Sequence, residues 1–236
     1  PRPGVSELLV VHANISSFTE EWSVPTDDVR LWVCLHEYLH HVILRQPHVA
    51  ERMNELITRY VSAFESNSQA LGNQFGGLDP SNPESMGQLE GLMNDPEALM
   101  GVVQSDAQRA MLPEISALLA AIVGYVDHMM DSIGSTLISS YSMISEALHR
   151  RRVTADPTDR FLQRMLGLEL DQACYEQGRS FVDGVVERGG RPALARLWES
   201  ARELPTPNEI VAPGLWLARI DLGDLDEPSA PADEEE

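Results

Sequence analysis

The sequence contains no lysine, and all 17 of its basic residues are arginine. This bias indicates a GC-rich genome rather than a function. Cysteine is also scarce, because only Cys34 and Cys174 are present. Two cysteines are too few for a disulfide scaffold, so we expect a reducing, cytoplasmic environment. No uninterrupted apolar run reaches about 18 residues, which argues against a membrane span.

The start of the chain, PRPGVSELLVVHANI, lacks the charged and apolar regions of a signal peptide. No methionine precedes it, so we expect the whole protein to begin earlier. The formal net charge is -20 at pH 7, which would repel both nucleic acid and an anionic bilayer. Much of this charge lies in an acidic, Pro- and Ala-rich end, which we expect to be disordered. The predicted division is a domain over 1–220 and a tail over 221–236.

Proline and glycine positions divide the rest of the domain into helices. Thr26 as N-cap and the following aspartates predict a helix to about Gln46, and Pro47 begins the next one. The prolines of NDPEAL and LPEISALL each predict a new helix start, the second helix being the most buried. We expect a long loop over 66–95, further helices over 135–152, 157–166 and 169–188, and a docked extended segment over 204–220. The predicted fold class is a single, mainly α-helical domain.

The stretch LWVCLHEYLHHVIL carries an HExxH pattern formed by His36, Glu37 and His40. Residues four apart lie one above the other on a helix, so the two histidines can present imidazole nitrogens to one metal ion. Glu37 is rotated about 100° away. In zinc hydrolases of this pattern, the glutamate takes a proton from a zinc-bound water. The pattern therefore predicts a zinc site with Glu37 as general base.

The alternative is that both histidines simply pack in the core or face solvent. Their helical face also holds four apolar residues, which indicates an interior position: Val29, Trp32, Val33 and Ile43. Buried imidazoles need partners for their nitrogens, and a metal would supply one set. Cys34 lies on the opposite side of the helix and is predicted to be a buried apolar residue. His41 is predicted to lie off the shared face.

A catalytic zinc needs a third protein ligand, and the apolar helix with VGYVDHMMD offers acids for this position. Asp127 and Asp131 are four apart on one face. Asp127 is a candidate ligand, an orienting partner for a histidine, or a hydrogen-bonded structural residue. Two roles are also open for Tyr125, which is either a core residue or a hydrogen-bond donor to an oxyanion.

Several long stretches together resemble an actinobacterial family of zincin-like proteins described as zinc-dependent metalloproteases or hydrolases. They are DDVRLWVCLHEYLHHVIL, GYVDHMMD, LGLELDQACYEQGRSFVDGVVERGG and LPTPNEIVAPGLWLARI. The resemblance implies a helical fold around one zinc ion with His36 and His40 as ligands. It also implies a second motif, Glu-Gly-x-x-Asp, whose glutamate is the third ligand. Here Gly124 and Asp127 match the motif, but Val123 stands at the glutamate position.

Valine has no lone pair to donate, so this departure leaves three outcomes open. Asp127 moves in as ligand, another acid or His128 substitutes, or the metal and the activity are lost. Two functions follow. The first is a zinc-dependent metallopeptidase that acts on a peptide or protein. The second is a non-catalytic binding or scaffold protein that keeps the zincin fold.

Overall fold

The structure is a computed structural model that describes residues 8–63, 104–153 and 170–226. Its longer helices are α1 His12–Trp22, α2 Thr26–Leu44, α3 Pro47–Ser62, α7 Asp106–Met129, α9 Tyr141–Val153, α11 Gln172–Ala195 and α13 Pro213–Asp226. The shorter ones are the π-helix η1 Met130–Gly134, α8 Ser135–Leu137, the 3-10 helices η2 Arg196–Trp198 and η3 Ala201–Glu203, and α12 Pro207–Val211. None of the described residues forms a strand, so the predicted mainly α class is confirmed.

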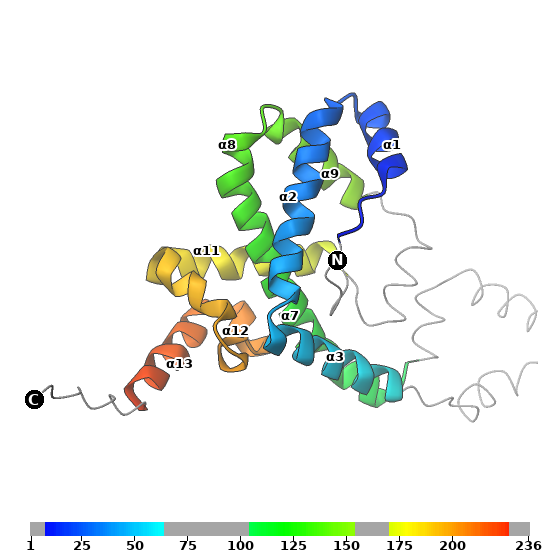
Figure 1. Ribbon diagram of the computed structural model, residues 1–236. Helices are drawn as coiled ribbons and strands as arrows, with labels where there is room; N and C mark the ends of the chain where they lie inside the picture. The colour runs from blue at the N-terminus through cyan, green and yellow to red at the C-terminus, as the bar shows by residue number, and fades with distance from the viewer. Residues whose placement is uncertain (1–7, 64–103, 154–169, 227–236) are drawn as a thin grey trace, which may run out of the picture.

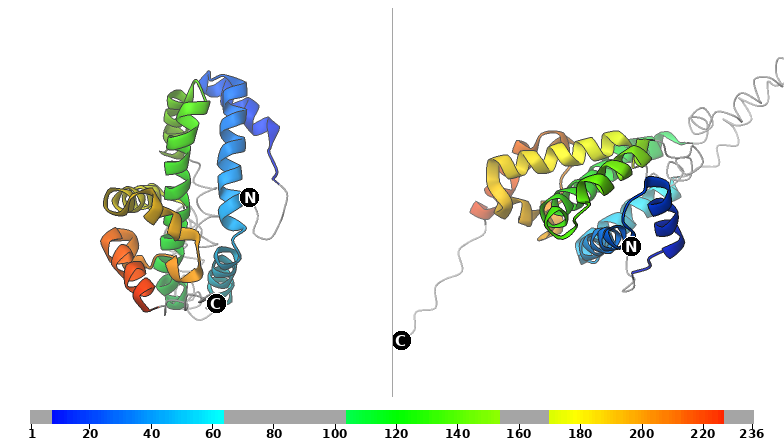
Figure 2. Two further views of the ribbon diagram at one scale, coloured as in Figure 1. Left: turned by 60° about the vertical axis from the view of Figure 1, so that its left-hand side comes forward. Right: turned by 90° about the horizontal axis from the view of Figure 1, so that it is seen from above.

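Helix α7 lies at the centre and separates two hydrophobic clusters. Helices α1, α2, α3 and α9 contribute to the first cluster, which α7 joins through Ile115, Ile122 and Val126. Helices α11, α12 and α13 contribute to the second, which α7 joins through Ala120 and Val123. Figures 1 and 2 show that α2 runs beside α7 and that α11 crosses α7. Side chains of α7 therefore face apolar neighbours on both sides.

The long apolar stretch through α7 also has the length and composition of a membrane span. In the described part of the chain, 106–137 is the one helical stretch that meets this criterion. More than half of its apolar window is buried inside the protein. That burial is what a core helix requires, and such a stretch is weak evidence for membrane insertion.

Helix α2 is fixed at both ends. Pro25 has an extended backbone and precedes the first helical residue, Thr26, which is not itself the N-cap. Asp28 in the first turn accepts hydrogen bonds from the Ser140 hydroxyl, at 2.6 Å, and from the Ser140 backbone N–H, at 3.0 Å. These two bonds lower the pKa of Asp28. The helix ends at Leu44, and α3 begins at Pro47 as the sequence predicts.

Proline positions account for two differences from the sequence-based prediction. Helix α7 begins at Asp106, where Ser105 and Gln108 form a capping box, so Pro113 lies inside the helix rather than at its start. The segment predicted to be extended contains α12 and α13, because Pro207 and Pro213 each occupy a first turn that tolerates proline.

The predicted ends of two segments also differ in the structure. The backbone of α11 turns sharply at Gly190, with φ 71°, near the expected helix end. Helix α13 continues to Asp226, past the predicted domain boundary at 220. The predicted loop over 66–95, the helix in NDPEAL and the helix over 157–166 lie outside the described residues. Residues 227–236 of the tail predicted over 221–236 lie outside them as well.

Candidate metal and peptidase site

His36 and His40 lie on the same face of α2, as their spacing predicts. Their ring centroids are 4.4 Å apart and their planes are inclined by 52°. Both side chains are half-buried, and Val29, Trp32 and Ile43 on the same side of the helix are buried. The Trp32 indole stacks on the His36 ring with a centroid distance of 4.6 Å. The predicted interior face of α2 is therefore present.

Hydrogen bonds fix the tautomers of both histidines. His40 Nδ1 lies 3.1 Å from the backbone oxygen of His36. A carbonyl oxygen only accepts, so Nδ1 of His40 carries the proton and Nε2 carries a lone pair. His36 Nδ1 lies 3.4 Å from Glu37 Oε1, so its Nδ1–H faces a carboxylate in the same way. Zinc-binding histidines are commonly oriented by such contacts to carbonyl and carboxylate oxygens.

The pKa of His40 is lowered to about 4, chiefly by burial and then by the neighbouring His36. His40 is therefore neutral at pH 7, which is the form that binds metal. The pKa of Glu37 is lowered to about 2, mainly by the hydrogen bond from His36 and against the opposing effect of burial. Glu37 is charged at neutral pH, and its side chain is 27% exposed.

Asp127 lies in a separate polar cavity of about 300 Å³. Trp32 forms part of its wall, so the residue that stacks on His36 also borders the cavity of Asp127. Asp131 lines the same cavity and accepts a hydrogen bond of 2.8 Å from the Tyr141 hydroxyl. Asp131 belongs to the π-helix η1, and such helices often occur at functional sites.

The two histidines fit zinc, but the described residues do not complete a three-ligand site. No group of three His, Cys, Asp or Glu side chains within 8–63, 104–153 and 170–226 is arranged to hold an ion. Asp127 does not join His36 and His40 in this conformation. Val123 is buried at 4% exposure among the apolar side chains of the second cluster.

Some of the other candidate residues lie where they were expected and others do not. Cys34 is exposed rather than buried, and His41, which was predicted only to lie off the face of His36 and His40, is buried. Tyr125 packs edge-on against Trp198 with ring centroids 5.3 Å apart, which supports its role as a core residue. His128 is half-buried on α7.

Sequence reasoning missed the residues that α9 and α11 bring to the polar cavity. Tyr141, His149 and Arg179 line it together with Asp127. Tyr141 and His149 both belong to α9, and Arg179 belongs to α11. Both helices are far along the chain from the HExxH pattern and from each other, so no local spacing indicates that these residues meet around Asp127. Trp32 was recognised only as an apolar face residue, although it contacts both His36 and this cavity.

Comparisons with known proteins show the family to which the chain belongs. A family model described as zincin-like metallopeptidase matches residues 1–217. No curated protein matches the chain. The chain is similar to a crystal structure described as a "putative hydrolase with a novel fold" from Chloroflexus aurantiacus, with 27% sequence identity and a TM-score of 0.54. The match covers 88% of this chain and 56% of that one, so this chain spans little more than half the length of that protein. The family match extends over all but the last part of the chain. The chain therefore belongs to the zincin-like metallopeptidases.

Proposed function

We propose that the chain is a zinc-dependent peptidase in which His36 and His40 bind the metal and Glu37 is the general base. The observation that carries this proposal is the tautomer pair described above. Each Nδ1–H faces an oxygen, of Glu37 or of the His36 backbone, so each Nε2 is left with a lone pair. The family to which the chain belongs supports zinc as the ion.

A bound zinc ion supplies a Lewis acid that activates water and polarises a peptide carbonyl. Glu37 would take the proton of the attacking water on a carboxylate oxygen and later deliver it to the leaving amine. With a pKa of about 2, Glu37 holds a proton weakly while it contacts His36. A substrate that covers Glu37 would remove water from it and raise its pKa toward the range that proton transfer requires.

For the third ligand we retain Asp127, which lies one turn beyond Val123 on α7. Because Trp32 contacts both His36 and the cavity of Asp127, ligation by Asp127 requires a rearrangement around Trp32. The proposed substrate is a peptide or protein, and we keep cytoplasmic location and the absence of nucleic-acid and membrane partners as parts of the proposal.

Zinc content and hydrolysis test these roles separately. We expect purified protein to contain about one zinc per chain by mass spectrometry, and His36→Ala or His40→Ala to lose most of it. His12→Ala is the matched control, because His12 is exposed and bonds to Arg30. Glu37→Gln should keep its zinc but lose about 10²–10⁴-fold in peptide hydrolysis. Unchanged hydrolysis by Glu37→Gln would refute the mechanism.

The second candidate function is a zincin-fold protein that has lost its metal and acts only by binding. Val123 favours it, because a buried valine stands where the family places a ligand. In this case the isolated protein would hold clearly less than one zinc per chain. Val123→Glu should then raise zinc affinity. If it does not, Val123 is not close to the metal, and the alignment of the second motif with this chain is wrong.

A further inference from the structure

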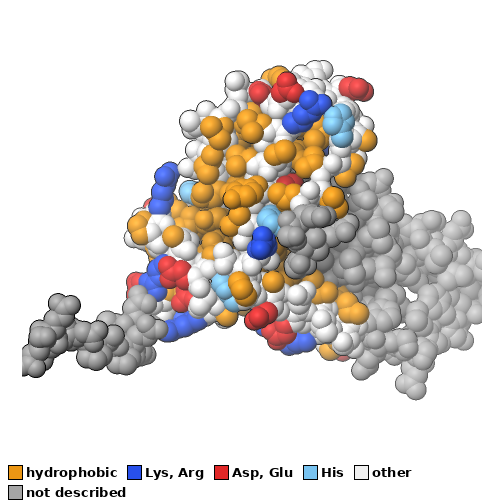
Figure 3. Space-filling model, in the orientation of Figure 1, with side chains coloured by type: hydrophobic (Ala, Val, Ile, Leu, Met, Phe, Trp, Pro, Cys, Tyr) orange, Lys and Arg blue, Asp and Glu red, His pale blue; other side chains and the backbone are white. Residues whose placement is uncertain are grey.

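An apolar groove begins at Glu37 and is not needed to hold a metal. It has a volume of about 290 Å³ and lies between α1, α2 and α9. Phe18, Trp32 and Ile144 are buried side chains that face it, one from each helix. Leu9, Val10 and Val11 line it as well, and these three residues are exposed. Figure 3 shows apolar side chains gathered over the face that carries α2.

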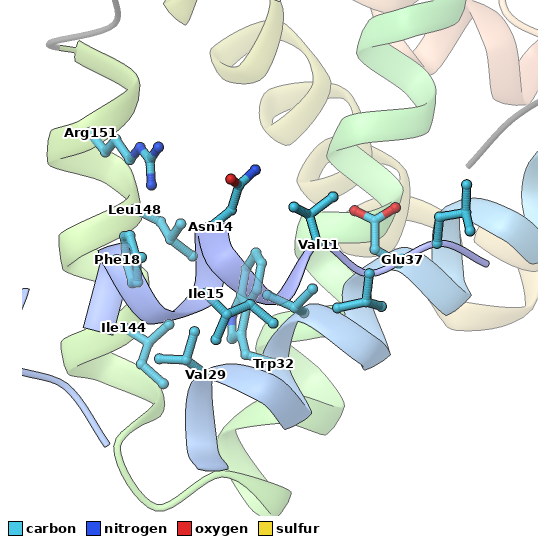
Figure 4. A pocket seen from close by; sticks show the side chains of 13 residues that line it. Val11, Asn14, Ile15, Phe18, Val29, Trp32, Glu37, Ile144, Leu148 and Arg151 are labelled. Carbon is cyan, nitrogen blue, oxygen red and sulfur yellow. The ribbon is translucent and has the colours of Figure 1, made fainter. Parts of the chain in front are cut away.

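The two ends of the groove carry opposite charges. Figure 4 shows Glu37 at one end and Arg151 at the other, with the apolar side chains between them. The Arg151 guanidinium lies 5.6 Å above the centre of the Phe18 ring, so it is held over the groove wall. In a chain with a net charge of -20, this cation gives the far end a local preference for a negative group.

The length of the groove matches a short piece of extended peptide. Val29 and Glu37 both line it and are eight residues apart on α2, which corresponds to about 12 Å along the helix. An extended chain covers this distance in roughly three to four residues. A peptide bond placed at Glu37 would therefore have the next few residues in contact with Trp32 and Phe18, and the chain would continue toward the end of the groove that carries Arg151.

We propose that this groove binds the substrate on one side of the cleaved bond, selecting a bulky apolar side chain beside the bond and a carboxylate at Arg151. This inference rests on the proposed peptidase function for the position of the bond, but not for binding itself. The carboxylate has two possible sources, which are the C-terminus of the peptide and an acidic side chain.

Binding can be measured without hydrolysis by fluorescence anisotropy, using the full chain in the presence of a metal chelator. The probes are labelled pentapeptides that differ only at one central position, Phe or Ser. Each is made with a free or an amidated C-terminus, and a further amidated peptide ends in Glu. We expect the Phe peptide to bind at least about tenfold more tightly than the Ser peptide, because one large apolar side chain leaves water.

Two pairs of variants locate the binding. Leu9→Asp places a charge on the exposed rim and should weaken binding of the Phe peptide at least fivefold, whereas Leu215→Asp changes another exposed leucine, on α13, and should not. Arg151→Gln should remove the preference for a carboxylate, and the peptide arms show which carboxylate is involved. Arg150→Gln is its control, because Arg150 is exposed, bonds to Glu146 and does not line the groove.

The outcomes separate this proposal from the peptidase function. Selective binding of the Phe peptide without hydrolysis in zinc would support the groove and refute the peptidase. Hydrolysis in zinc, with no difference in binding between the Phe and Ser peptides, would support the peptidase function and overturn the groove proposal. A chain that is dimeric by sedimentation, dissociates on Leu9→Asp and binds none of the peptides would show that a second copy occupies the groove, and would overturn the proposal.

Discussion

Helices α7 and α11 approach each other so closely at Gly124 and Gly178 that neither position has room for a side chain. The Cβ of an alanine at 178 would lie 2.2 Å from the carbonyl oxygen of Ala120 and 3.0 Å from the backbone nitrogen of Gly124. Both of these atoms belong to the backbone of α7 and cannot rotate away. Relief of the shorter contact requires the helices to separate by roughly 1 Å.

We therefore expect Gly178→Ala to destabilise the protein by about 2–4 kcal/mol. Overpacking of a core typically costs about 1–3 kcal/mol and occasionally more, and because the overlap here is with backbone atoms that cannot rotate away we expect a gross cost of about 3–5 kcal/mol. Separation of the helices also weakens the contacts of Phe181 and Val182, which are fully buried beside Gly178. The better helix propensity of alanine offsets about 1 kcal/mol.

The measurement is urea unfolding followed by far-ultraviolet circular dichroism. Gly214→Ala in α13 is the control, because the nearest atom to its added Cβ is Arg188 Nε at 4.0 Å. This variant should be neutral or stabilised by up to about 1 kcal/mol. If Gly178→Ala is as stable as Gly214→Ala, the two helices are not in backbone contact. The placement of Arg179 in the polar cavity next to Asp127 would then also be wrong.

Three further predictions concern pH, an internal ion pair and fluorescence. In the presence of a chelator, lowering the pH from 6.5 to 4 should reduce the free energy of unfolding by at most about 3 kcal/mol, because in this range His40 binds a proton in the unfolded chain but not in the folded one. His40→Gln should flatten this part of the stability curve. Glu209→Gln should destabilise the protein by about 2–4 kcal/mol without changing zinc content, because Glu209 is buried and accepts two hydrogen bonds from Arg219; equal urea midpoints would contradict this. Zinc should change tryptophan emission through the His36 ring that stacks on Trp32, and Trp32→Phe should lose this change; an undiminished signal would assign it to another tryptophan.

Local signals in the sequence predicted the part of the site that lies on one helix. The HExxH spacing, the apolar face and Pro47 together located α2 to within two residues of its end. Prolines were less informative elsewhere, since Pro113 lies within α7 and Pro213 begins a helix in a segment expected to be extended. A proline forbids one hydrogen bond at its own position, and neighbouring packing decides whether a helix tolerates that loss.

The rest of the site depends on contacts between distant parts of the chain, which spacing does not encode. Trp32 meets the cavity of Asp127 only because α2 packs against α7 and η1. The groove exists because α1, which the sequence did not predict, lies beside α2 and α9. Exposure of Cys34 and burial of His41 likewise depend on which neighbours cover each side of α2.

Position 123 links the stability of the fold to the question of activity. A glutamate there would carry a charge into the centre of an apolar cluster, and such a charge is tolerated only when it is paired or binds a metal. Valine instead buries an apolar side chain and contributes about 1.5–3 kcal/mol to folding. If the second motif aligns with this chain as the resemblance implies, valine at this position stabilises a metal-free protein and removes one metal ligand. For this reason, a zinc stoichiometry near one would require a ligand that compensates for Val123, and Asp127 is the nearest acid on its helix. A clearly lower stoichiometry would mean that α7 now serves packing alone.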